Sequence, residues 1–130
     1  MLQRVPASSE ERDLAAAFTA VSIVMREWGQ VRYVAGADLA PEARRAINGV
    51  VQLTDAAGVT GAQARGLAGL PAGYLVVHVL TIANDTGAFA GTRGPVPLQR
   101  TGFGCGTKYL FQLARTSGGW KVEKQDFIQC

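Results

Sequence analysis

Apolar side chains near the start of the chain recur every three or four positions, which is the period of an α-helix. Ser8 and Glu11 have the spacing of a capping box, and Gly29 suits the position after a helix end. The pattern predicts a long N-terminal helix over residues 10–28 whose apolar stripe faces the core. The stripe consists of Leu14, Phe18, Val21, Met25 and Trp28.

Shorter signals follow this helix. Residues 30–35 alternate between apolar and polar side chains, which predicts a short strand. Pro41 fits the first turn of a second helix, and Asn48 with Gly49 would interrupt or end it. Residues 54–60 have the composition of a loop. The segment 61–70 is rich in Ala and Gly and predicts one weak helix.

The second half of the chain is rich in β-forming residues. Residues 74–83 read Y-L-V-V-H-V-L-T-I-A, a nearly apolar run that predicts a strand covered on both faces. Residues 108–115 and 120–130 flank a turn at 116–119, which predicts a closing hairpin. The segment 86–99 is rich in Gly and Pro and predicts a long loop or a distorted hairpin. Helices first and antiparallel strands last indicate a single α+β domain over residues 1–130.

This order of elements resembles the nuclear-transport-factor-2-like, or cystatin-like, superfamily. The resemblance is carried by the N-terminal helix, the long strand from Tyr74 and the hairpin K-Y-L-F-Q-L-A-R-T-S-G-G-W-K-V. It implies a long helix packed on a strongly curved antiparallel sheet, giving a cone. It implies no single function, because the superfamily includes isomerases, dehydratases, ligand carriers, secretion components and toxin-immunity proteins.

Charge is sparse and scattered. Charged residues make up 18% of the chain and the formal net charge is +3. Nucleic-acid binding needs clustered cations, so we expect no nucleic-acid partner. We also expect no membrane span, because no apolar run reaches the roughly 18–20 residues that cross a bilayer. Residues 1–10 have no apolar region typical of a signal peptide, although a peptide removed from the native chain is compatible with this sequence.

The two cysteines, Cys105 and Cys130, are either bonded to each other or free. A disulfide between them would close a loop of about 25 residues and stabilise the fold by roughly 3 kcal/mol. A bonded pair would place the protein in an oxidising compartment, periplasmic or secreted. Two free thiols would fit the cytoplasm equally well.

His78 is the only histidine of the chain. A zinc site needs several nitrogen, sulfur or carboxylate ligands at suitable spacing, so we expect no metal and no cofactor. His78 in mid-strand is either a structural side chain with one hydrogen-bond partner or a general base inside the cone. The second interpretation would make the protein a small-molecule-binding or isomerase-type member of the superfamily.

The segment 86–95 offers the other candidate site. Phe89 and Arg93 lie on a Gly-rich stretch beside the predicted sheet, and such side chains are enriched at interface hot spots. Alternatively, Phe89 folds onto the core. The sparse catalytic inventory favours a non-enzymatic protein-binding module, with a cognate inhibitor or immunity protein of a bacterial toxin as one form. Phe89 and Arg93 would then bind the partner protein; the sequence indicates neither the partner nor the oligomeric state.

Overall fold

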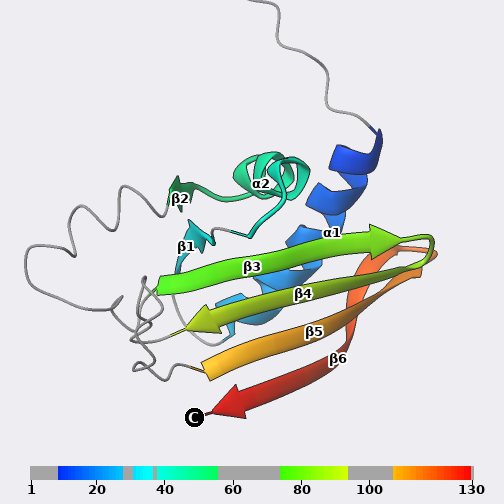
Figure 1. Ribbon diagram of the computed structural model, residues 1–130. Helices are drawn as coiled ribbons and strands as arrows, with labels where there is room; N and C mark the ends of the chain where they lie inside the picture. Colours follow the sequence, from blue (N-terminus) through cyan, green and yellow to red (C-terminus); the bar gives the residue numbers. More distant parts are fainter. Residues whose placement is uncertain (1–8, 28–30, 37, 56–73, 94–106, 130) are drawn as a thin grey trace, which may run out of the picture.

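The computed structural model describes residues 9–27, 31–36, 38–55, 74–93 and 107–129. These residues form two helices and six strands, whose arrangement is drawn in Figure 1. The predicted weak helix at 61–70 and both cysteines lie outside the described residues. In chain order the elements are α1 (Ser9–Arg26), β1 (Arg32–Ala35), α2 (Pro41–Asn48), β2 (Leu53–Asp55), β3 (Tyr74–Ala83), β4 (Thr86–Arg93), β5 (Thr107–Thr116) and β6 (Gly119–Gln129).

The six strands form one open sheet in the order β2-β1-β3-β4-β5-β6. Strands β3 to β6 are antiparallel neighbours, whereas β1 runs parallel to both β2 and β3. The class is therefore α+β, but the expectation of a wholly antiparallel sheet is wrong for β1 and β2. The reason is that α2 carries the chain back across the sheet, and such a crossover joins parallel strands.

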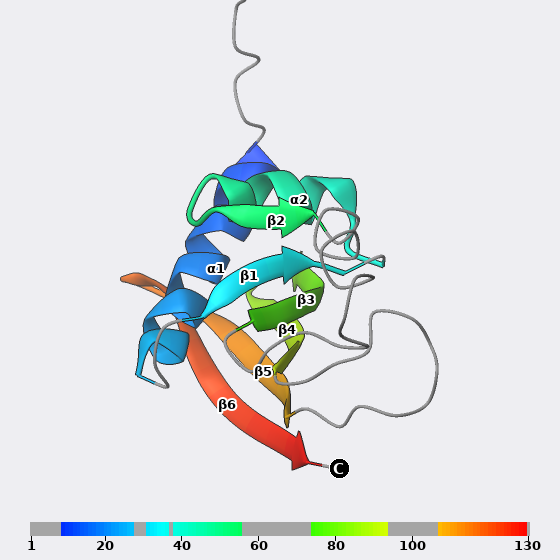
Figure 2. The same cartoon turned by 90° about the vertical axis from the view of Figure 1, so that its left-hand side faces the viewer.

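The sheet curves, and α1 lies across its inner face (Figures 1 and 2). Leu14, Phe18, Val21 and Met25 of the predicted stripe are buried against the sheet, and Trp28 lies outside the described residues. The buried side chains of α2 belong to the same core. An ion pair between Arg45 Nε and Glu11 Oε1 (2.7 Å) also joins the two helices. Among the described residues, no helix is both long and apolar enough to cross a membrane.

Aromatic rings fill the space between α1 and the sheet. The ring of Phe18 lies edge-on to Tyr33, with centroids 5.3 Å apart, and 6.1 Å from the centroid of Phe89. Phe89 in turn stacks on Phe111 at 5.6 Å. Because these side chains come from the helix and from three strands, they fix the helix to the curved sheet.

Strand β2 departs from the predicted loop at 54–60. For 86–99 the prediction was a long loop or a distorted hairpin, and over the described residues 86–93 the hairpin is confirmed: β4 pairs antiparallel with β3, with a bulge between Val77 and Val79. In β4, glycine is needed for packing. A Cβ on Gly91 would lie 3.2 Å from both Leu75 Cδ1 and Phe89 Cζ, and one on Gly87 would lie 3.0 Å from the carbonyl oxygen of Thr81. Glycine has low strand propensity, yet here it lets neighbours pack directly on the backbone. Tertiary packing therefore overrides local preference.

Replacing Phe18 with alanine should lower the free energy of unfolding by about 3–5 kcal/mol, because the side chain is fully buried among aromatic neighbours. Urea denaturation measures this loss. Ile23→Ala on the same helix is the matched control, since Ile23 is 56% exposed and should change stability by under about 0.5 kcal/mol. A loss below about 1 kcal/mol for Phe18→Ala would contradict the assigned core.

Candidate functional site

The structure corrects the expected binding loop. The segment predicted as a long loop or a distorted hairpin contains strand β4, and Phe89 is only 1% exposed. Its side chain packs with the rings of Phe18 and Phe111, so Phe89 belongs to the core and is no surface anchor. Arg93 is the last residue of β4, is partly buried and already takes part in an interaction. A role of Arg93 in partner binding stays a prediction.

His78 occupies a bulge in β3. The pairing of β3 with β4 slips between Val77 and Val79, which leaves His78 as the extra residue. A hydrogen bond of 2.8 Å joins His78 Nε2 to Thr92 Oγ1. Thr92 lies opposite Val76 in the pairing of β3 with β4, so the two side chains share a face. Val76 is adjacent to the core residue Val77, so this face is the one opposite to the core. The imidazole therefore lies on the sheet face that is turned away from α1.

The surroundings of His78 favour its neutral form. Burial lowers the pKa of the imidazole below 6.5, and the positive charge of Lys108 lowers it further, while Asp38 partly opposes both. The interpretation of His78 as a base between helix and sheet does not fit this position. A half-buried histidine with one hydroxyl partner matches the structural alternative. Among the described residues, no three His, Cys, Asp or Glu side chains come close enough to hold a metal ion.

A polar cluster joins α1 to the turns of the β3–β4 and β5–β6 hairpins. The carboxylate of Asp13 accepts hydrogen bonds from two guanidinium nitrogens of Arg115 and from Trp120 Nε1 (3.0 Å). The guanidinium carbon of Arg115 also lies 4.6 Å from the centroid of the Trp120 ring, and Arg115 Nε lies 3.4 Å from Asp85 Oδ1. These contacts hold the pKa of Asp13 below 3.8, with the bonds from Arg115 as the largest cause. The cluster satisfies its own charges and acts as a structural clamp.

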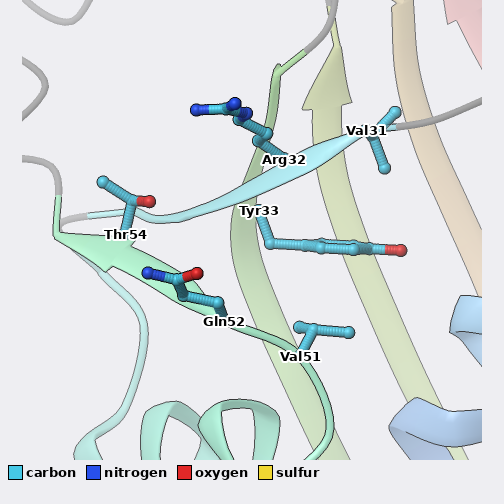
Figure 3. Close-up of a pocket in the computed structure, with 6 residues that line it drawn as sticks. All are labelled: Val31, Arg32, Tyr33, Val51, Gln52 and Thr54. Atoms are coloured by element: carbon cyan, nitrogen blue, oxygen red, sulfur yellow. The ribbon is translucent and has the colours of Figure 1, made fainter.

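A pocket of about 380 Å³ opens beside β1 and β2 (Figure 3). Arg32 and Tyr33 are adjacent on β1, and their side chains point in different directions (Figure 3). Tyr33 is buried against Phe18, and burial raises the pKa of its hydroxyl. Arg32 is the one charged residue among the described lining residues, so the pocket brings no acid–base pair together. Those lining residues are Val31, Arg32, Tyr33, Val51, Gln52 and Thr54.

Strand β6 is a further candidate binding feature. It is the last strand of the sheet, and no described strand pairs with its outer side (Figure 1). Phe127 is 42% exposed and Ile128 is 52% exposed. Phe127 packs edge-on against Tyr109, at 5.2 Å between centroids, whereas Ile128 points to the opposite face because successive strand residues alternate. Unpaired backbone between two exposed apolar side chains makes β6 a candidate binding edge.

A bulge explains why the sequence did not reveal this edge. Unbroken alternation along residues 120–130 would place Trp120, Val122 and Ile128 on one face. In the structure Val122 pairs with Leu113 and Lys124 with Gln112, so one extra residue intervenes and shifts the alternation. Trp120 and Val122 are partly buried, while Ile128 turns outward. A bulge has no reliable signal in a single sequence.

Lowering the pH should destabilise the protein through His78. Because the folded-state pKa is lower than the ordinary 6.5, the unfolded chain binds the proton more readily. The stability from neutral His78 is fully present above about pH 6.5 and is lost as the pH falls through the folded-state pKa. The single imidazole signal in NMR spectra should titrate with a midpoint below 6.5. His78→Gln should remove the corresponding pH dependence of urea stability; a midpoint at or above the ordinary value would refute this.

Asp13→Asn should lower the urea midpoint at neutral pH, because it removes the charge that Arg115 and Trp120 contact. The folded-state pKa of Asp13 lies below 3.8, so the stabilisation is present above that value and is lost as the pH falls through the folded-state pKa. The difference between variant and wild type should therefore vanish in strong acid. Asp126→Asn, in an exposed pair 3.8 Å from Lys124, is the control and should change little.

No family model matches this chain, and no match is found among curated proteins or among solved structures. The resemblance to the nuclear-transport-factor-2-like superfamily, which the order of elements suggests, therefore stays a prediction.

Proposed function

We propose that the protein is a non-enzymatic protein-binding module that binds its partner along β6. The observation that carries this proposal is the open edge of β6 with Phe127 and Ile128 exposed on opposite faces. An extended segment of a partner can add to such an edge as a further strand. Backbone hydrogen bonds then provide affinity, and contacts with the alternating side chains provide specificity.

The packing between α1 and the sheet supports binding at the edge over chemistry inside the fold. Phe18, Phe89 and Phe111 occupy the space where a cone-type pocket would lie. His78, the candidate base, lies on the other face of the sheet and bonds to Thr92. These positions weaken the alternative of a small-molecule-binding or isomerase-type protein with His78 in its pocket.

A cognate inhibitor or immunity protein of a bacterial toxin is the specific form of this function that we propose. Its support is the family resemblance of the sequence, which is carried by the N-terminal helix and the antiparallel strands at the end of the chain; these are α1 and β3 to β6. The parallel strands β1 and β2 are not part of this resemblance. We also propose that the helix and the curved sheet together have the cone shape of the cystatin-like architecture. A disulfide between Cys105 and Cys130 would indicate that the protein is exported. Intact-mass measurement after alkylation without reductant tests this disulfide, because two alkylated thiols would show that it is absent.

Substitution of the exposed apolar side chains should weaken partner binding. The partner is identified by co-purification from the native source, purified, and titrated calorimetrically against Phe127→Ser and Ile128→Ser. Each variant should bind more than tenfold more weakly, since an interface depends on a few anchors. Ile128→Ser should leave the melting temperature near that of wild type, because this side chain is exposed. Phe127→Ser should lower the melting temperature modestly, because it also removes the ring contact with Tyr109; a cooperative transition well above the titration temperature shows that the variant is folded.

Ile23→Ser is the control matched to Ile128→Ser, because it removes an isoleucine of similar exposure from α1. It should bind the partner as tightly as wild type. Unchanged affinity in both β6 variants would contradict binding at this edge.

A further inference from the structure

The charges on β6 restrict which strand can pair with it. Lys124 and Asp126 are exposed on one face of the strand, on either side of Gln125, and Lys124 Nζ lies 3.8 Å from Asp126 Oδ2. Opposite charges directly across two antiparallel strands are stabilising, and like charges are destabilising. A suitable antiparallel strand therefore carries an acid opposite Lys124 and a base opposite Asp126, with one residue between them.

A second copy of β6 meets this requirement in one symmetric register. When two identical antiparallel strands are related by a twofold axis through the sheet, the pairing is centred on one residue that faces its own counterpart. Centring on Lys124 sets two lysines opposite each other, and centring on Asp126 sets two aspartates opposite each other. Centring on Gln125 places Lys124 opposite Asp126 of the second copy, and this pair occurs twice.

We propose that a second copy of this chain pairs with β6 in the antiparallel register centred on Gln125, which joins the two sheets into one. The inference rests on the proposed function, because it uses the same edge: a heterologous partner has to displace the second copy. Regular pairing is limited on one side by the bulge between Val122 and Lys124. Such a short seam buries little area, so the dimer is weak and reversible.

Charge reversal tests the register. Sedimentation velocity from about 10 μM to about 1 mM should show wild-type protein dimerising reversibly, and added salt should weaken the dimer because exposed charges are screened. Lys124→Asp and Asp126→Lys each set like charges opposite each other and should raise the dissociation constant at least tenfold. The two single variants mixed together should dimerise, as should the double variant, because both arrangements restore opposite charges.

Lys121→Asp is the control on the same strand, since this residue faces no charge in the register centred on Gln125. It should dimerise like wild type, and unchanged melting temperatures should show that all variants fold.

The proposal is overturned if wild type stays monomeric at about 1 mM, or if the single reversals dimerise as well as wild type. A monomer whose Phe127→Ser variant still loses the heterologous partner would reject self-pairing and leave the proposed function standing. If the protein forms a charge-dependent dimer but the heterologous partner binds all β6 variants equally, self-pairing stands and the proposed function at this edge is rejected.

Discussion

The contact of Phe18 with Tyr33 and Phe89 is the interaction on which the rest of the structure depends. One ring from α1 meets one from the parallel side of the sheet and one from the antiparallel side. The helix can lie across the sheet only if the strands curve around these rings. Because aromatic side chains occupy this space, the inner face of the described fold is packed as a core, and accessible binding groups lie at the periphery.

The two ends of the sheet differ in how well they are covered. At one end β2 is short and lies beside α2. Three of the four residues of the neighbouring strand β1 are buried. At the other end β6 begins under the helix, where Asp13 holds Trp120, and continues past it. The bulge after Val122 marks the change, since residues 123–128 are exposed. The clamp therefore fixes the first half of β6 and leaves the second half available without loosening the strand.

Sequence periodicity predicted the elements whose signal is local. The stripe of α1, the proline start of α2, the run of β3 and the closing hairpin all lie within a few residues of their predicted bounds. Strand β2 was missed because it is very short. The sequence left a long loop and a distorted hairpin open for β4, because this strand depends on Gly87 and Gly91 packing against distant backbone. The candidate sites were harder still. Asp13 and Arg115 are 102 positions apart, and only the folded chain brings them together.

Edge strands carry a risk of indiscriminate pairing, and charged side chains on them usually act as a barrier. A uniform row of lysines would repel every basic or identical strand. The arrangement on β6 differs, because Lys124 and Asp126 carry opposite charges two positions apart on the same face. Such a pair disfavours shifted registers that oppose like charges, and it favours the register in which each charge meets its opposite. With Phe127 and Ile128 beside it, this pattern makes the edge selective for its partner strand while still allowing it to bind.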